Sequence, residues 1–346
     1  MRRHRTSPIV STTLFVVPSL LIIGAVWWFF TELRPADPGN KEPVFITIAP
    51  KTGFRDIARQ LDEAKLVRNR YLFELVVLLA GLGKDLKAGT YELSPSMSST
   101  AIAKALSKQA SAAEVTLTIP EGWTNTQIGT YLTSRGIGTA EDFMAAANAT
   151  DSRTILPDDR FDFLAEKPST ASLQGFLFPD TYRVFPNATS TDVIRKMLTN
   201  FGVKVSADMR ARIHESGRTL YDVLTLASII EREVRIDSDR RMVADIFWRR
   251  IGIGMPLQSD ATVNYVTGKS VLRSTISDIE TDSRYNTYKY PGLPPGPIGN
   301  PGLSSINAAI DPTPNDYLYF LTDASGNAHY GKTYDEHLAN IDRYLE

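Results

Sequence analysis

The stretch Leu226-Ala-Ser-Ile-Ile-Glu231-Arg-Glu-Val234, inside a longer segment from Thr219 to Arg235, decides the fold at the centre of this chain. Its apolar positions recur every three or four residues, which places them on one face of an α-helix. The side chains that share this face are Leu220, Leu224, Ala227, Glu231 and Val234. The segment therefore predicts a buried helix that carries one carboxyl group on its apolar face.

That carboxyl group, Glu231, has two interpretations. Burial disfavours the charged form, so an unpaired glutamate there stays protonated near neutral pH and suits general acid catalysis. Alternatively, Glu231 forms an ion pair with Arg235 one turn further on, which contributes only a few tenths of a kcal/mol. The helix by itself leaves both open. Glu233 points to another face, where we expect it to be solvated.

The composition excludes several classes of protein. With 346 residues, of which 42% are hydrophobic and 22% charged, the chain can form more than one folded unit. A net charge of −1 and the lack of a phosphate-binding glycine loop argue against nucleic-acid binding. There is no cysteine, so disulfides and thiolate metal sites are excluded. The four histidines, His4, His214, His329 and His337, lack the spacing of a zinc site.

The N-terminus predicts a membrane anchor. Residues 9–30 are uncharged, mostly apolar and long enough to cross a bilayer. Three arginines lie in residues 1–8, whereas Glu32 and Asp37 follow the apolar stretch, so residues 1–8 are expected to be a cytoplasmic tail. The rest of the chain then lies outside the cytoplasm.

A cleaved signal peptide is the competing interpretation of this segment. The apolar stretch ends in Trp27-Trp-Phe-Phe30, which suits the aromatic belt of a retained anchor better than a small-residue cleavage site. Retention is therefore favoured. Residues 31–43 are rich in proline, glycine and charge, and they predict a flexible linker.

Two folded parts are expected after the linker, both of the α+β class. Residues 44–113 predict a small module with strands at Val44–Ile48 and Gly89–Leu93, and helices at Arg70–Leu82 and Ser98–Ser107. Residues 114–346 predict a larger mixed domain that begins with a strand at Val115–Ile119. Its further expected elements are helices at Val193–Phe201 and Ser238–Arg250, a strand at Tyr317–Leu321, and a last helix with Tyr334, Leu338, Ile341 and Leu345 on one side.

Two loops stand out as candidate binding segments. One is the polar cluster Leu257–Thr262, and the other is the proline- and glycine-rich stretch Tyr285–Gly302. A loop of this second kind is rigid before binding, so it loses little entropy when a ligand arrives. Flat aromatic faces for sugar rings and amides for hydroxyl or acetamido groups are offered by Tyr285, Tyr288, Tyr290, Gln258, Asn286 and Asn300. The alternative is a rigid surface loop whose tyrosines cap the core.

Taken in order, these motifs resemble the MltG (YceG-like) family of endolytic murein transglycosylases. The resemblance rests on Gly175-Phe-Leu-Phe-Pro-Asp-Thr-Tyr182, Leu226-Ala-Ser-Ile-Ile-Glu231, Leu257-Gln-Ser-Asp260, Tyr285-Asn-Thr-Tyr288 and Gly292-Leu-Pro-Pro-Gly-Pro-Ile298, and it covers nearly the whole chain. It implies a LysM-like module at residues 44–113 and a catalytic domain at residues 114–346.

The resemblance also implies an activity and a site. Glu231 would be the catalytic acid of an enzyme that cleaves peptidoglycan glycan between N-acetylmuramic acid and N-acetylglucosamine. The implied substrate groove contains Gln258, Asp260, Tyr285, Asn286 and Tyr288. Two positions depart from the family pattern: Gln174 stands where a glutamate is usual, and Ala261 where a proline usually follows the aspartate.

The implied mechanism needs one carboxylate, because the C6 hydroxyl of the muramic acid residue attacks its own C1 and leaves a 1,6-anhydro end. No metal or organic cofactor is implied. A hydrolytic muramidase that uses Asp260 as a second carboxylate is the nearest alternative, and a non-catalytic wall-binding or division scaffold is another. We expect an inner-membrane protein that faces the periplasm, acts on nascent or mature glycan strands, and lies near peptidoglycan synthases.

Overall fold

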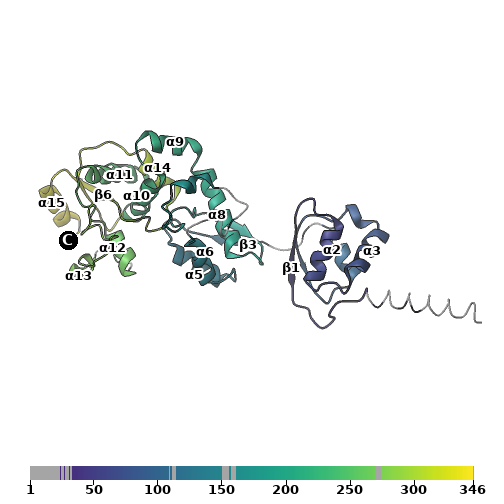
Figure 1. The fold of residues 1–346 in the computed structure, drawn as a ribbon. Coiled ribbons are helices and arrows are strands. Elements are labelled where there is room, and N and C mark those ends of the chain that lie inside the picture. Colours follow the sequence, from purple (N-terminus) through teal and green to yellow (C-terminus); the bar gives the residue numbers. More distant parts are fainter. Residues whose placement is uncertain are drawn as a thin grey trace, which may run out of the picture. The chain divides into compact units, whose positions relative to one another are not determined.

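The computed structural model describes residues 24, 27, 31, 33–108, 110, 114–149, 156, 161–269, 271 and 274–345. The fold is mixed α+β, with helices and small two-stranded sheets (Figure 1). The chain divides into two compact units. The first comprises Met1–Glu114 with Phe185–Asn187, and the second comprises Val115–Val184 with Ala188–Glu346.

The first unit is built on one antiparallel strand pair. Strand β1 (Val44–Ile48) pairs with β2 (Gly89–Leu93), with Val44 opposite Leu93. The helices of this unit are α2 (Phe54–Glu63), α3 (Arg70–Leu79) and α4 (Ser99–Leu106), and a 3₁₀ turn η1 spans Leu82–Lys84. Their apolar faces meet in one core around Phe73 and Tyr91. The strands and helices expected within residues 44–107 are confirmed.

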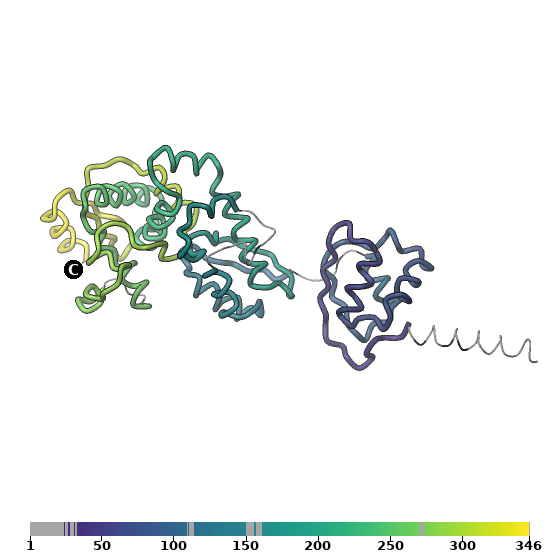
Figure 2. The backbone as a smooth tube through the Cα atoms, in the orientation of Figure 1, coloured from purple at the N-terminus to yellow at the C-terminus, as the bar shows by residue number. Residues whose placement is uncertain are grey.

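Residues 33–37 belong to the first unit rather than to a flexible linker. The backbone N–H of Ser99 donates to the carbonyl of Leu33 (3.2 Å), and that of Asp37 donates to the carbonyl of Pro95 (3.0 Å). The Arg68 side chain donates from Nε to the carbonyl of Pro35 (2.9 Å). The expectation of a free tether is therefore wrong for this stretch, which follows the surface of the unit (Figure 2).

The expected anchor at residues 9–30 lies outside the described residues, apart from positions 24 and 27. Within the part of the chain that the structure describes, no helix has the length and apolar character needed to span a membrane.

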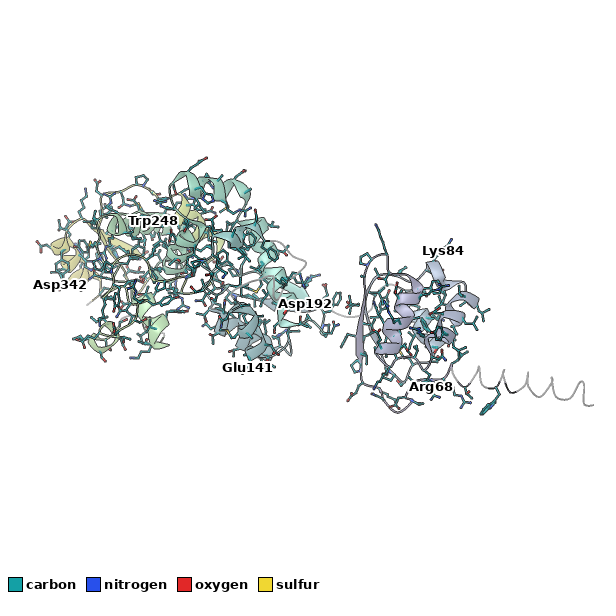
Figure 3. The ribbon with its side chains drawn as sticks, viewed as in Figure 1. Arg68, Lys84, Glu141, Asp192, Trp248 and Asp342 are labelled. Atoms are coloured by element: carbon teal, nitrogen blue, oxygen red, sulfur yellow. The ribbon has the colours of Figure 1, made fainter. Side chains whose placement is uncertain are left out.

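The second unit surrounds a buried central helix, α10 (Leu220–Glu233), which packs against α11 (Asp237–Gly252) and α14 (Leu303–Ile310). Trp248 of α11, labelled in Figure 3, donates from its indole nitrogen to the carbonyl of Ala309 on α14 (2.9 Å). The other helices are α5 (Asn125–Ser134), α6 (Ala140–Ala147), α8 (Ser190–Lys204), α9 (Ala207–Glu215), α12 (Asp260–Thr267), α13 (Ile276–Ile279) and α15 (Tyr334–Tyr344), with a 3₁₀ turn η2 at Asp162–Glu166.

Two strand pairs complete this unit. Strand β3 (Val115–Thr118) pairs with β4 (Thr181–Val184), and β5 (Tyr319–Thr322) pairs with β6 (Ala328–Gly331), both antiparallel. The last helix, α15, forms as expected, but it buries none of its residues, and Tyr334 and Leu338 face solvent.

Helix α10 starts where its sequence requires. Thr219 and Asp222 form a capping box, in which each side chain bonds to the other residue's backbone N–H. Nine of its residues are buried, namely Leu220 and the eight consecutive positions from Val223 to Ile230. Because the helix is buried all round, its polar C-terminal turn must find partners inside the unit.

Candidate active site

Glu231 lies in a buried ion pair that joins α10 to α11. Its Oε1 accepts a hydrogen bond from Nη2 of Arg240 (2.9 Å), and its Oε2 accepts one from the backbone N–H of Gly302 (2.8 Å). The Glu231 side chain is only 7% exposed. Of the two interpretations, the structure shows the ion pair, and the cationic partner of Glu231 is Arg240 rather than Arg235.

A second carboxyl group, Glu121, lies against the same glycine. A Cβ atom added to Gly302 would lie 2.0 Å from Oε1 of Glu121, so any larger residue there would displace the Glu121 carboxyl group. Burial and the charge of Glu231 raise the pKa of Glu121. Glu121 is not recognisable as a site residue from the sequence, because Pro120-Glu-Gly122 has the composition of an ordinary turn.

The turn that carries Glu121 is fixed to the segment before α14. The N–H of Gly122 donates to the carbonyl of Asn300 (2.7 Å), and the N–H of Asn300 donates to the carbonyl of Trp123 (2.9 Å). These paired bonds hold the start of the second unit against the end of its proline- and glycine-rich loop. The backbone around Glu231 is therefore held rigidly by these two bonds.

Glu233 has a raised pKa, a property that the sequence offered as one of two interpretations of Glu231. Burial raises the pKa of Glu233 to about 7, and the nearby charge of Asp260 acts in the same direction. The hydroxyl of Ser259 and the N–H of Ala261, at the start of α12, donate to its carboxyl group. The expectation that Glu233 is solvated is therefore wrong. The residue still keeps part of its surface accessible.

Asp260 and Tyr288 lie beside Glu233. The Tyr288 hydroxyl donates to Oδ1 of Asp260 (3.1 Å), which also accepts from the N–H of Ser274 (3.1 Å). Burial and the charge of Asp260 raise the pKa of Tyr288, so its hydroxyl keeps its proton. Glu233, Asp260 and Tyr288 thus form one polar cluster, brought together from α10, α12 and the loop after α13.

Gln258 is held in an uncommon backbone conformation at the edge of this cluster. Its φ angle of 53° lies in the left-handed region, and its N–H donates to the carbonyl of Thr287 (3.1 Å). Its side chain accepts from Arg250 (3.4 Å) through Oε1. Gln258 itself is exposed, which leaves its amide within reach of a ligand.

Asn286 and Asn300 are fully buried, with an exposure of 0%. Asn286 donates to the carbonyls of Ile279 and Thr281 (both 2.8 Å). The side-chain Oδ1 of Asn300 accepts from the N–H groups of Gly175 and Leu177, and its Nδ2 donates to the carbonyl of Trp123. The expectation that these two asparagines contact sugar is corrected, because their polar atoms hold the protein's own backbone.

Tyr285, in the loop after α13, belongs to a group of tyrosines that includes Tyr265 of α12 and Tyr221 of α10. Its ring lies 5.0 Å from that of Tyr265, and burial raises the pKa values of Tyr285 and Tyr221. Tyr290 lies further along the loop and lines an open cavity of about 300 Å³ with Arg284, Pro291, Leu293 and Pro295. The cavity and the carboxyl cluster involve different residues.

Gln174 and Ala261, the two departures from the family pattern, each have a physical explanation. Gln174 accepts from the N–H of Asn125 (3.0 Å) and donates to the Tyr265 hydroxyl (3.0 Å) and the Pro297 carbonyl (2.7 Å). An ionised glutamate could not make the two donations. Ala261 supplies an N–H to Glu233 that a proline would lack.

No group of three or more histidines, aspartates and glutamates is arranged to hold a metal ion among the residues with described positions. The arrangement is instead a glycosidase-like one, with a carboxyl group of raised pKa beside a second carboxylate and neutral donors.

Comparison with known proteins agrees with this class. The chain belongs to the YceG-like family, whose model matches residues 46–343. It is 32% identical over 334 residues to a protein of Bacillus subtilis (strain 168) named endolytic murein transglycosylase, covering 94% of this chain and 91% of that protein. It is 31% identical over 340 residues to the protein of that name from Streptococcus pneumoniae serotype 2 (strain D39), covering 91% of this chain and 60% of the relative.

A solved structure has the same fold. It is a YceG-like protein of Listeria monocytogenes, with a TM-score of 0.58 and 33% sequence identity, and the match covers 86% of this chain and 99% of that one.

Proposed function

We propose that this protein is an endolytic murein transglycosylase that cleaves peptidoglycan glycan strands between N-acetylmuramic acid and N-acetylglucosamine. The observation that carries the proposal is the polar cluster of Glu233, Asp260 and Tyr288, which lies beside the exposed side chain of Gln258. The names of relatives that match more than nine-tenths of this chain support the same activity.

In the proposed reaction, Glu233 acts first as an acid and then as a base. It donates its proton to the glycosidic oxygen as the bond from C1 of the muramic acid residue to that oxygen breaks. The C6 hydroxyl of the same sugar then bonds to C1, and its proton passes to the Glu233 carboxylate. The products are a 1,6-anhydromuramic end and a new N-acetylglucosamine end, and the enzyme regains its starting protonation state.

Glu231, the residue favoured from the sequence, is paired with the Arg240 guanidinium, whereas the Glu233 carboxyl group is bonded to the Ser259 hydroxyl. A general acid needs a proton to give at neutral pH, and burial supplies that condition at Glu233. Glu231 instead holds Arg240 and the N–H of Gly302. We propose that Glu231 positions the segment before α14, and that Glu233 performs the chemistry.

The neighbours of Glu233 support the proposed steps. Gln258 presents an exposed amide that can orient the acetamido group of the sugar. Tyr288 holds Asp260 through a hydrogen bond, and Tyr285 offers an aromatic surface on the same loop. No further carboxylate is needed, because attack by the sugar's own hydroxyl gives the proximity advantage of an intramolecular reaction.

Hydrolysis is the second candidate reaction, because Asp260 lies close enough to Glu233 to raise its pKa. In that case Asp260 would serve as the second carboxylate of a muramidase. We expect digestion of glycan strands in ¹⁸O-labelled water to give unlabelled 1,6-anhydromuramic ends, measured by mass spectrometry of the released muropeptides. Reducing muramic ends that carry ¹⁸O would instead establish hydrolysis.

The pH dependence of cleavage follows from the proton on Glu233. Since the free enzyme must hold this proton, we expect kcat/KM to fall about tenfold per pH unit above a pH of about 7. Below that pH, Glu233 imposes no loss. The same raised pKa opposes folding as the pH rises from 4.5 to about 7, because the unfolded chain releases this proton first. Rates measured across pH on a neutral glycan substrate test the first expectation.

An Ala261→Pro variant provides a check on this assignment. Proline removes the N–H that stabilises the Glu233 carboxylate, and proline is tolerated in the first turn of a helix. The alkaline limb should therefore move to higher pH. A limb that stays in place while folding is intact would assign the titration to another group.

We further propose a location. Residues 44–113 form a LysM-like module that holds glycan, and residues 9–30 anchor the chain in the inner membrane with the catalytic domain in the periplasm. The apolar stretch and its arginine-rich start support the anchor. Proximity to peptidoglycan synthases would let the enzyme terminate or trim nascent strands.

A further inference from the structure

Helix α3 of the first unit has an exposed apolar face. Its exposed fractions are 64% for Tyr71, 39% for Leu75, 58% for Leu78 and 73% for Leu79. These positions recur at intervals of four, three and one, so they lie on one side of the helix. The opposite side, with Phe73, Val76 and Val77, is buried in the core. Leucines exposed together to this degree indicate a surface that another phase or molecule covers.

Cationic groups lie at both ends of this face. Arg70 stands at the start of α3, with its guanidinium 4.6 Å from the centre of the Tyr71 ring and its Nη2 donating to the Tyr71 hydroxyl (2.6 Å). Lys84 ends the 3₁₀ turn that follows the helix. Apolar side chains between a tyrosine and basic residues are typical of helices that lie at a lipid surface.

The connection to the N-terminal apolar stretch places this unit near a bilayer. The hydrogen bonds of Leu33 and Asp37 fix residues 33–37 to the unit. Arg68, just before α3, holds the carbonyl of Pro35, so the start of α3 lies beside the incoming chain. Only residues 31 and 32 separate Leu33 from the end of the apolar stretch at residue 30. Extended chain covers about 10 Å over that interval.

We propose that the exposed face of α3, formed by Tyr71, Leu75, Leu78 and Leu79, rests on the lipid bilayer that holds residues 9–30. This inference rests on the proposed anchor and adds a second membrane contact to it. Because residues 33–37 are held to the unit and lie close in sequence to the apolar stretch, the unit has little freedom to leave the surface. The contact would set the orientation of the first unit relative to the membrane.

Site-specific fluorescence quenching tests the contact, and the absence of native cysteine makes single labels clean. The full-length Leu79→Cys chain, labelled with an environment-sensitive fluorophore, is placed in phosphatidylethanolamine and phosphatidylglycerol vesicles that contain brominated acyl chains. The matched control is Glu92→Cys, an exposed position on β2 of the same unit. We expect quenching at position 79 to exceed that at position 92 by about threefold or more.

Each outcome bears on a different part of the proposal. A chain that floats with the vesicles but shows equal quenching at both positions would overturn the α3 contact and leave the anchor standing. A chain that does not float would overturn both. Lack of quenching at position 79, together with disulfide cross-linking between two unlabelled Leu79→Cys chains, would overturn the lipid contact and assign the face to a second copy. A Leu75→Gln/Leu78→Gln variant that floats, and in which quenching at position 79 falls, would support the lipid contact.

Discussion

Replacement of Glu233 by glutamine is expected to lower the rate of glycan cleavage by about 10²- to 10⁴-fold, the range that a positioned general acid contributes. Glutamine keeps the size of the side chain and can still accept from Ser259 and Ala261, so the fold should persist. Muropeptide release by the full chain gives the rate, and far-UV circular dichroism with thermal unfolding checks the fold.

The Glu231→Gln variant is the discriminating comparison. Glu231 lies two residues from Glu233 on the same helix, but its carboxylate holds Arg240. We expect this variant to lose stability and to retain far more activity than Glu233→Gln at a temperature where both are folded. If Glu231→Gln abolishes cleavage while Glu233→Gln spares it, the sequence-based assignment to Glu231 is correct and our proposed acid is wrong.

Replacement of Arg240 by methionine should destabilise the second unit by about 3–5 kcal/mol, the cost of leaving a buried charge without its partner. The Glu231 side chain is 7% exposed and the Arg240 side chain 12%, so water cannot replace the lost guanidinium. Chemical denaturation of the detergent-solubilised full chain measures the change.

Two further variants give this experiment its controls. Arg235 is exposed, so Arg235→Met should change the free energy of unfolding by less than about 0.5 kcal/mol. The double variant Glu231→Gln/Arg240→Met leaves only the exposed Asp237 without its partner and should recover part of the loss. Equal losses for Arg235→Met and Arg240→Met would contradict the ion pair seen in the structure.

Local sequence patterns predicted the helices and strands whose formation depends on residues close together in the chain. The alternation at Val44–Ile48 and Gly89–Leu93 gives strands β1 and β2, and the spacing around Glu231 gives α10. The mixed α+β class followed from the same signals. Helix α14, which directly follows the proline- and glycine-rich loop, was not predicted.

The roles of the two glutamates could not be read from spacing. Helical geometry shows that Glu231 and Glu233 point in different directions, but not what lies in each direction. Arg240 comes from the next helix, and Ser259 comes from a segment 26 residues away. Hydrophobic residues around Glu231 suggested a protonated acid, whereas tertiary contacts supply it with a cation and give Glu233 the desolvated position.

Asn286 and Asn300 illustrate a second limit. An amide in a rigid loop has the same signature whether it binds a sugar or the loop's own backbone. In this fold both amides bind the protein backbone. The Asn300 side chain, for example, accepts from the N–H groups of Gly175 and Leu177 and donates to the carbonyl of Trp123.

The position of Asn300 near the end of the chain has a consequence for how the enzyme folds during synthesis. Its partners lie about 125 residues or more earlier in the chain, and contacts between such distant segments form late in folding. A chain interrupted during synthesis before Asn300 would contain Glu231, Glu233 and most of the central helices. It would lack the hydrogen bonds of Asn300 that join these segments. The bonds from Asn300 to Gly175, Leu177 and Trp123 can therefore form only after most of the polypeptide has been made.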